Sequence, residues 1–462
     1  MKGVRPPNER LKVRRLARLL VAVAAALGLC VTPPANAQSV DDWLHRQYLT
    51  GDWGGFRTSL EAKGITLRGG YVSETAGNPL GGRRQGVQDA QQIAFGADLN
   101  LARLVNIQGG EAHVTFTSRA GQSLAATDIG NLISEQEIFG GGQNFRLAEL
   151  SYLQSLFEDR LDTKFGRIHA ADDFAHSPIY CYFQNNGFCG QPAGIPIDSG
   201  FTTFPVASWG GFLNLGLRSD LYLQAGAYEV NPSLNDSGNG FKLSTAGATG
   251  VITPFEAGWK AALGSDQLLG HYKAGAYYDN SAASDLGAPL AGPPALISGR
   301  WGVYVLVDQT IYRKGPARAE PVNPVGPPYR MELLEVAQAE KGLTVFGVFV
   351  YAHPDTALLE FYWEAGLLYL GTFRGRDHDS IGLAVNQSRL SNALIAAQNM
   401  RNLVMPGSVN VQSAESDIEL NYRAELTPWF SLMPNIQYIV RPNAVITIPN
   451  AFVLGLQAIV TF

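Results

Sequence analysis

The segment from His169 to His176 carries the densest set of side chains that could do chemistry. It reads His-Ala-Ala-Asp-Asp-Phe-Ala-His, so two imidazoles and two carboxylates lie within eight residues. Such groups can bind a divalent metal or activate a nucleophile. However, no G-x-S-x-G or H-E-x-x-H motif frames them, and a few polar residues are common in a long loop. We therefore predict no catalytic residue and no metal site, with a divalent ion that staples this loop as the alternative.

Two cysteines lie close together just after this segment. Cys181 and Cys189 are eight residues apart in the stretch Tyr-Cys-Tyr-Phe-Gln-Asn-Asn-Gly-Phe-Cys-Gly. No C-x-x-C motif or flanking histidine pair supports zinc binding here. In an oxidising compartment such a pair is expected to form a disulfide that closes a small loop. Two free thiols, or half of a metal site, are the alternatives.

The N-terminus predicts export from the cytoplasm. Seven basic residues precede an apolar core at 19–31, and Ala35-Asn36-Ala37 follows this core. This order is typical of a secretory signal peptide with A-x-A cleavage. We expect residues 1–37 to be the signal peptide and the mature chain to begin at Gln38. Lipidation at Cys30 is the alternative.

Composition and charge exclude several classes of protein. Without the signal peptide the formal net charge changes from −5 to −11, because seven basic residues and one acidic residue are removed. An acidic chain is a poor partner for nucleic acid. The chain has 16% charged residues, 46% apolar residues and 51 glycines, which suits neither a disordered chain nor a helical membrane protein. No later run of 18 apolar residues is present, so a mature chain that spans a membrane must be a closed β-barrel.

The C-terminus is typical of a membrane-spanning strand. Apolar side chains alternate over the last eleven residues, from Phe452 to Phe462, while Gly455, Gln457 and Thr461 fall mainly on the other face. A strand of about 9–11 residues with one apolar face is the unit of a transmembrane β-barrel. A terminal aromatic residue resembles the insertion signal of outer-membrane barrels. We therefore expect a protein of the outer membrane of a Gram-negative bacterium, in contact with its lipid.

Period-two alternation bounded by turn residues predicts about sixteen strands. The clearest are 64–76, 89–103, 111–119, 144–154, 209–217, 221–229, 271–279, 299–310, 341–352, 358–370, 414–426, 431–440 and 451–462, with weaker strands at 161–167, 255–264 and 379–387. An even count places both termini on the periplasmic side. The predicted fold class is therefore all-β, a transmembrane antiparallel β-barrel formed by residues 64–462.

The segment before the barrel, residues 38–63, is predicted to form a short N-terminal periplasmic helix. Its larger apolar residues can form one stripe: Trp43, Leu44, Tyr48, Trp53, Phe56 and Leu60. A stripe of this kind usually serves packing. We expect the segment to plug or brace the periplasmic mouth of the barrel.

The connections between strands alternate in length, as expected for long extracellular loops and short periplasmic turns. The long ones are 120–143, 168–208, 230–254 and 388–413, and the short ones are 156–160, 218–220, 264–270 and 427–430. One stretch departs from this pattern. Residues 311–340 are long, yet the count places them on the periplasmic side. They are either an unusual insertion or a sign that the count slips there.

Alternation also assigns side chains to the lumen. A charge costs about 2–4 kcal/mol at the bilayer midplane, so a charged row must face inward. In strand 414–426 that row holds Asp417, Glu419, Asn421, Arg423 and Glu425. The same reasoning places these further residues in the lumen: Glu74, Asp98, His113, Glu149, Asn435 and Gln437. A polar interior in a barrel of this size predicts a water-filled channel.

Several short motifs stand at wide spacing along the chain. They include L-T-G-D-W-G-G-F-R at 49–57, F-G-R at 165–167, F-P-V-A-S-W-G at 204–210, G-T-F-R-G-R-D at 371–377 and L-M-P-N-I-Q-Y at 432–438. From about Trp43 to Phe462, this succession resembles the carbohydrate-selective porins of the OprB family, although 311–340 is not part of the pattern. The resemblance implies a sixteen-stranded outer-membrane barrel through which monosaccharides, typically glucose and related sugars, diffuse into the periplasm.

We therefore predict a passive sugar porin without a cofactor, with a general porin for other solutes as the alternative. Loop 168–208 is expected to fold inward and narrow the pore. Charged and amide groups there can bind sugar hydroxyls weakly enough for the sugar to leave. The candidate pore-lining residues are Arg167, Asp172, Asp173, Glu74, Glu149, Asp98, Glu419, Arg423 and Gln437. For each, a charge network that stiffens the wall is the alternative, and both a monomer and a homotrimer are compatible with the pattern.

Overall fold

The structure is a computed structural model of the chain. It describes residues 40–177, 179, 181–189, 191–289, 295–315 and 341–462. The predicted signal peptide, residues 1–37, lies outside the described residues. The same is true of residues 316–340, which make up most of the stretch that departs from the alternation of connection lengths.

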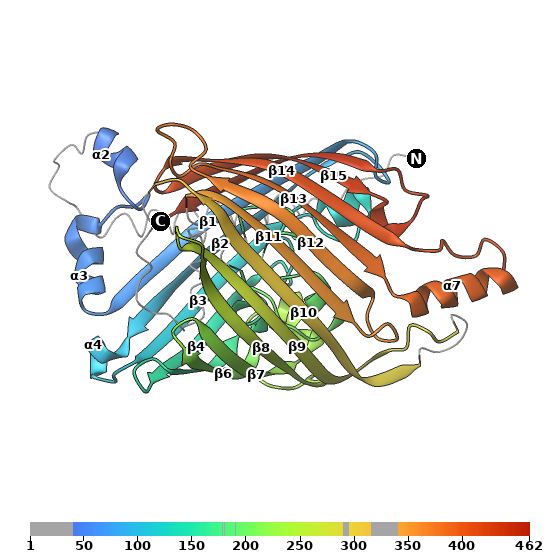
Figure 1. Ribbon diagram of the computed structural model, residues 1–462, viewed down its shortest axis with the longest axis horizontal. Helices are drawn as coiled ribbons and strands as arrows, with labels where there is room; N and C mark the ends of the chain where they lie inside the picture. Colours follow the sequence, from blue (N-terminus) through green and yellow to red (C-terminus); the bar gives the residue numbers. More distant parts are fainter. Residues whose placement is uncertain (1–39, 178, 180, 190, 290–294, 316–340) are drawn as a thin grey trace, which may run out of the picture.

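Within the described residues, sixteen antiparallel strands form one closed barrel (Figure 1). Each strand pairs with its neighbours in sequence, and β1 pairs with β16 to close the ring. The strands are β1 (Ile65–Leu80), β2 (Val87–Asn100), β3 (Gly110–Gly121), β4 (Phe145–Leu156), β5 (Leu161–Ile168), β6 (Ser208–Arg218), β7 (Leu221–Val230), β8 (Gly250–Leu263), β9 (Leu268–Ser284), β10 (Leu296–Arg313), β11 (Gly342–Ala352), β12 (Leu359–Leu370), β13 (Ser380–Leu390), β14 (Ala414–Thr427), β15 (Phe430–Val440) and β16 (Ala451–Thr461). The predicted fold class is confirmed. Because β10 pairs directly with β11, the count does not slip across 311–340.

Side chains alternate across the wall as the sequence predicts. In β14, Ile418 and Leu420 are 38% and 47% exposed, whereas Asp417 and Glu419 are fully buried. The exposed row is apolar because it faces lipid, and the buried row is charged because it faces the lumen.

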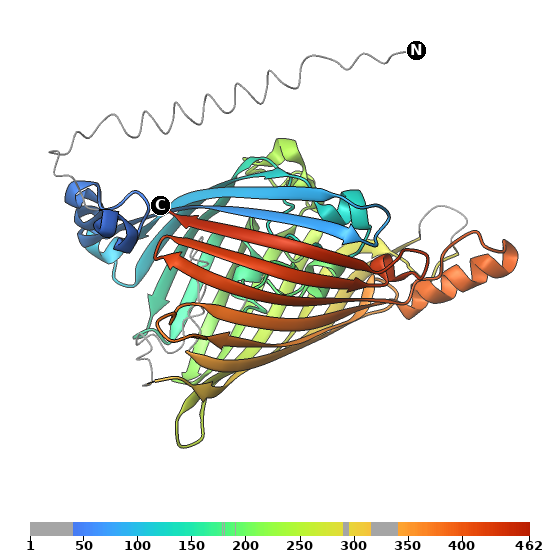
Figure 2. The ribbon, with the colours of Figure 1, turned by 90° about the horizontal axis from the view of Figure 1, so that it is seen from above.

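The two ends of the barrel differ in their connections (Figure 2). The short turns lie at the end that also holds the C-terminus, and the long connections lie at the other end. There α7 (Asn392–Val404) extends beyond the wall, begun by Ser391, whose Oγ accepts from two backbone N–H groups at 3.1 and 3.2 Å. The helix was not predicted in 388–413. At the short-turn end, α4 (Leu101–Val105) begins at the Asn100 cap, which explains why the strand predicted at 89–103 ends early.

The remaining helical segments are short. They are η2 (Ala125–Ile129), α5 (Ala170–Asp173), α6 (Gly194–Asp198), η3 (Pro232–Asn235), η4 (Ser237–Asn239) and η5 (Pro442–Ala444). Among the described residues, none of the helices is both long and apolar enough to cross a membrane.

The N-terminal segment is not one helix but α2 (Val40–His45), η1 (Trp53–Gly55) and α3 (Phe56–Ala62), beside the mouth of the barrel (Figure 2). Gly54 and Gly55 have φ of 69° and 92°, a left-handed conformation that interrupts a continuous helix. The Trp43 ring packs on Trp429 with centroids 4.5 Å apart. The Arg57 guanidinium donates to the backbone oxygen of Phe462 at 2.9 Å. These contacts hold the segment against the turn between β14 and β15 and against the end of β16.

Two connections in the described chain fold into the barrel, 122–144 between β3 and β4 and 169–207 between β5 and β6. We call them the inward loops. The second one buries an apolar core against the inner faces of the wall, including Phe346 and Val350 of β11. The polar interior predicted from the sequence therefore does not extend to this side of the barrel. The inner row of β11 is apolar because loop side chains cover it in place of water.

Candidate functional site

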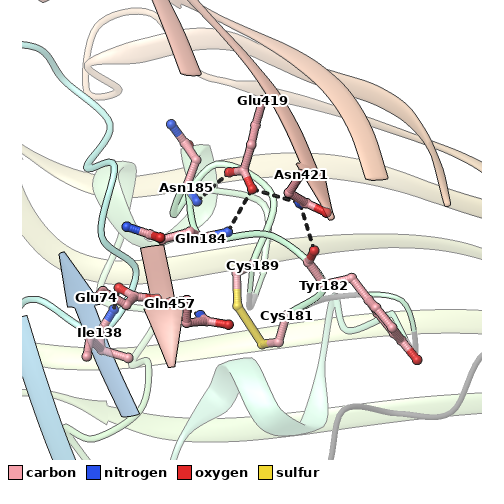
Figure 3. The surroundings of a disulfide bond; sticks show 10 residues. All are labelled: Glu74, Ile138, Cys181, Tyr182, Gln184, Asn185, Cys189, Glu419, Asn421 and Gln457. Atoms are coloured by element: carbon pink, nitrogen blue, oxygen red, sulfur yellow. Dashed lines mark hydrogen bonds between the residues drawn. A yellow bond between two sulfur atoms is a disulfide. The ribbon is translucent and has the colours of Figure 1, made fainter. Parts of the chain in front are cut away.

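Carboxylates of the barrel wall hold the backbone of the inward loops. The Glu419 carboxylate of β14 accepts hydrogen bonds from the backbone N–H groups of Gln184 and Asn185 at 3.0 and 2.7 Å (Figure 3). The Glu74 carboxylate of β1 accepts from the backbone N–H of Ile138 at 3.2 Å. Both carboxylates are fully buried. Two of the predicted pore-lining residues are thus anchors for loops in this structure.

The predicted disulfide between Cys181 and Cys189 is present (Figure 3). It closes the segment 181–189, which we call the disulfide loop. This loop also contacts Gln437, another predicted site residue, whose amide oxygen accepts from the Asn185 amide at 3.0 Å. Gln437 is fully buried, and it holds the disulfide loop through this hydrogen bond.

A buried ion network surrounds Lys164 of β5. Its Nζ lies 3.1 Å from the Glu149 carboxylate and 3.5 Å from Asp173 of α5. The Tyr228 hydroxyl donates to Asp173 at 2.9 Å. Burial raises the pKa of Asp173 to about 7, against the opposing effect of Lys164. The structure thus brings the predicted residues Glu149 and Asp173 together through a lysine that the sequence analysis did not select.

Two further predicted residues pair with histidines. Asp98 of β2 lies 2.7 Å from Nδ1 of His113 and 2.5 Å from Arg68. Asp172 of α5 lies 2.7 Å from Nδ1 of His169, within the segment from His169 to His176. The first pair lies within the barrel wall, and the second lies within an inward loop. In the described part of the chain, no group of three His, Cys, Asp or Glu side chains could hold a metal ion.

The two predicted arginines differ in their position. Arg423 of β14 lies on the lumen side, with its guanidinium 5.8 Å from the Tyr182 ring of the disulfide loop. Arg167 of β5 instead pairs in register with Leu150 and Trp209, which are 45% and 38% exposed. It therefore starts from the row that faces away from the lumen, although its side chain is buried.

Three residues that the sequence analysis did not select lie together on the lumen side. The Arg119 guanidinium of β3 lies 5.5 Å from the Phe204 ring and donates to Gln92 at 2.7 Å. It also interacts electrostatically with the carboxylates of Glu137 and Glu74. Glu137 and Phe204 belong to the two inward loops and are each half-buried. We call Arg119, Glu137 and Phe204 the aperture residues.

The sequence could have indicated only one of these three residues. Arg119 continues the lumen row of His113 in the predicted strand 111–119, so alternation could have found it. Glu137 and Phe204 lie in loops, where no periodicity marks a side chain that faces the pore. Arg146 of β4 also lies near Arg119 and interacts with it electrostatically, and it donates to the backbone oxygen of Leu234 at 3.2 Å.

Comparison with known proteins decides the family. Residues 84–462 match the family model of the carbohydrate-selective porins, OprB family. This chain belongs to that family. It is therefore a sugar-selective porin of the outer membrane, a channel rather than an enzyme.

Relatives of this OprB-family porin match it along most of their length. Porin B of Pseudomonas aeruginosa is 31% identical over 433 residues, which cover 89% of this chain and 90% of that protein. The putative porin QuiX of Acinetobacter baylyi is 29% identical and covers 97% of this chain and all of that protein. The high-pH structure of Pseudomonas putida OprB is 31% identical, with a TM-score of 0.80 over 90% of this chain and 99% of that one.

Membership in the OprB family also orients the barrel. Short turns of outer-membrane barrels face the periplasm and long loops face outward. The inward loops therefore start at the extracellular end. The segment with His169 and His176 lies inside this loop region. Burial lowers the pKa of His176 to about 4, so its imidazole is neutral at pH 7.

Proposed function

We propose that this porin admits monosaccharides past Arg119, Glu137 and Phe204, which form the narrow, selective part of its pore. A guanidinium supplies several hydrogen-bond donors, and an ionised carboxylate supplies only acceptors. Sugar hydroxyls can use both. The apolar C–H face of a pyranose ring can lie on the phenyl ring. The single observation that carries the proposal is the 5.5 Å approach of the Arg119 guanidinium to the Phe204 ring, with Glu137 close enough to interact with Arg119 electrostatically.

The proposed aperture supports weak binding. Arg119 already donates to Gln92 and lies among the carboxylates of Glu137 and Glu74, so a sugar exchanges one set of partners for another. Such exchange costs little net free energy in either direction. A channel needs binding that favours entry and still permits exit.

The residues predicted from the sequence fall into two groups in this proposal. We infer that Glu149, Asp98, Asp172, Asp173 and Arg423 shape the charge of the lumen wall. We infer that Glu74, Glu419 and Gln437 act on sugars only through the loops they hold. Arg167 is left out of the proposed path, because it starts from the outward row.

The proposed organisation of the chain follows the sequence prediction. Residues 1–37 are the signal peptide, residues 38–63 brace the periplasmic mouth, and residues 64–462 form the barrel. The oligomer is expected to be a monomer or a trimer. Light scattering of the purified porin in detergent, corrected for bound detergent, tests this directly. A dimer would contradict the expectation.

Liposome swelling tests the proposed substrate class. Glucose, other monosaccharides, disaccharides and amino acids of similar size are compared for the native chain, an Arg119→Gln variant and an Arg160→Gln control from an exposed turn. We expect monosaccharides to enter faster than size-matched amino acids, and Arg119→Gln to reduce this preference. Rates that depend on size alone would favour the alternative, a porin without selectivity among sugars and other solutes. A preference unchanged by Arg119→Gln would overturn the proposed aperture.

A further inference from the structure

We propose that the disulfide loop is a specificity-determining element of the pore, because it positions Glu137, and that Glu419 is the positioning residue that holds this loop. The inference rests on the proposed function of Glu137 and extends it. It assigns a role in selectivity to residues that themselves contact no permeating solute.

The first step is a direct link between the inward loops. The backbone N–H of Glu137 donates to the carbonyl oxygen of Gln184 at 3.0 Å. The backbone N–H of Asn186 donates to the carbonyl oxygen of Ser134 at 2.9 Å. The two bonds run in opposite directions between the same pair of segments. Any shift of the disulfide loop is therefore transmitted to the backbone of Glu137.

The second step concerns how Glu137 is presented to the lumen. Its neighbours are tied to β1, because the Gln136 amide donates to the backbone oxygen of Glu74 at 2.7 Å and the Ile138 N–H donates to the Glu74 carboxylate at 3.2 Å. Gln136 and Ile138 are buried, at 0% and 1% exposure, whereas Glu137 between them is half-buried. The segment thus fixes the two flanks of Glu137 and leaves its side chain half-buried, where it interacts electrostatically with Arg119.

The third step is the anchoring of the disulfide loop on β14, which is separated from β1 by β15 and β16 in the wall. Glu419 receives two adjacent backbone N–H groups, those of Gln184 and Asn185, at 3.0 and 2.7 Å (Figure 3). The side chains add to this hold: Asn435 donates to the Gln184 amide oxygen at 2.6 Å, and Asn185 donates to Gln437 at 3.0 Å. Hydrogen bonds to a charged group are stronger than neutral ones. Glu419 is thus the side chain that holds two adjacent backbone groups of the loop at once.

The disulfide makes this anchoring effective. Phe183 inside the loop packs on Phe346 of β11 with centroids 5.9 Å apart, so the loop reaches from the apolar side of the lumen to β14. The Cys181–Cys189 bond limits the conformations open to the segment between them. A restricted loop loses less entropy when Glu419 binds it. The position of Glu137 then becomes well defined, which matters because hydrogen bonds weaken steeply with misalignment.

The test compares three variants in liposomes: Glu137→Gln, Glu419→Gln and the double replacement Cys181→Ala/Cys189→Ala. Glu158→Gln, in an exposed turn, is the matched control. A glutamine at 419 can accept only one of the two N–H groups through its amide oxygen, while its NH₂ group faces the other. We expect Glu419→Gln and the cysteine variant each to lower the preference for glucose over size-matched amino acids about threefold. Heat-modifiable mobility on gels verifies that each barrel is folded.

A positioning role for Glu419 predicts a second result that a merely structural role does not predict. In the Glu137→Gln background, adding Glu419→Gln should cause no additional loss of preference, because both changes act through one carboxylate. Additive losses would overturn the inference. If the cysteine variant does not fold, reduction of the native porin in liposomes replaces it, and an unchanged preference after verified reduction would also overturn the inference.

The two proposals fail in different ways. If Glu137→Gln leaves the sugar preference unchanged, the proposed function of Glu137 fails, and this inference fails with it. If Glu137→Gln lowers the preference but Glu419→Gln and the cysteine variant do not, the proposed function stands. In that case only the positioning role of the disulfide loop is wrong.

Discussion

The backbone N–H of Glu137 donates a hydrogen bond to the carbonyl oxygen of Gln184 at 3.0 Å, although one residue follows β3 and the other follows β5. This hydrogen bond connects the two inward loops to each other. The wall carboxylates Glu74 and Glu419 then fix the connected loops at two points. In this porin, acidic side chains of the lumen wall therefore hold loops.

The aromatic face of the aperture predicts an effect on sugar preference. Replacement of Phe204 by leucine keeps an apolar side chain of similar volume but removes the ring that lies 5.5 Å from Arg119. Aromatic contacts contribute about 0.5–1.5 kcal/mol, so we expect the preference for glucose over size-matched amino acids to fall about threefold, with little change in salt conductance. Liposome swelling and single-channel recording measure the two quantities. Phe157→Leu, in an exposed turn, is the control, and equal effects of both changes would contradict the prediction.

The ion network at Lys164 predicts an effect on stability. Lys164→Met leaves the buried carboxylates of Glu149 and Asp173 without the ammonium group that lies 3.1 and 3.5 Å from them. Breaking a buried ion pair by removing one partner costs about 3–5 kcal/mol. We expect a decrease of this order in the free energy of unfolding, measured by urea denaturation of the refolded porin with tryptophan fluorescence. The exposed Lys63→Met variant should change it by less than about 0.5 kcal/mol, and a similarly small effect at Lys164 would refute the prediction.

Asp198 of α6 predicts a pH dependence of stability. Its carboxylate accepts the Leu359 N–H at 3.0 Å, and burial raises its pKa from 3.8 to about 8. The folded state therefore holds a proton that the unfolded state releases above pH 4. The stability that this proton gives is complete below about pH 4 and is lost as the pH rises to about 8. The Asp198→Asn variant mimics the neutral acid.

We therefore expect Asp198→Asn to become more stable relative to the native chain as the pH rises. The gain is at most about 1.4 kcal/mol per pH unit between pH 4 and 8. Denaturant midpoints of both proteins at pH 4, 6 and 8 give the difference directly. A difference that is independent of pH would show that Asp198 is ionised in the folded porin throughout this range.

The N-terminal brace predicts a loss of stability without a change in the pore. The Arg57 guanidinium donates to the Phe462 backbone oxygen at 2.9 Å and lies 3.8 Å from the Tyr48 ring. A hydrogen bond to a charged group contributes about 1.5–3 kcal/mol, so Arg57→Ala should lower the free energy of unfolding by about that amount. Sugar rates in liposomes should match those of the native chain. A large change in conductance would mean that the segment plugs the mouth rather than braces it.

Much of this fold is readable from the chain. Lipid on one side and a lumen on the other impose a period of two, and the backbone must be fully hydrogen-bonded, so strands and closure follow from alternation. Strand 414–426 and the C-terminal strand show this most clearly, and both were placed within a few residues. The disulfide between Cys181 and Cys189 also followed from spacing and compartment. The apolar inner row of β11, with Phe346 and Val350, was visible in the sequence but was not used.

Alternation of apolar and polar residues could not predict which group each lumen side chain contacts. Glu419 and Glu149 both belong to lumen rows, yet one binds the backbone of a loop and the other binds Lys164. Period two gives the face of a residue, but not its depth or its partner.

The sequence by itself determined the barrel, its membrane and the face of most strand residues, with Arg167 of β5 as an exception, because these depend on local alternation and on burial of backbone groups in lipid. The inward path of loop 168–208 was predicted, but the tertiary structure alone decided that loop 122–144 enters the lumen beside it and that Glu137 and Phe204 meet Arg119 there. A loop has no repeating pattern, and its path is set by contacts between residues far apart in the chain, such as Glu74 with Ile138 and Glu419 with Gln184.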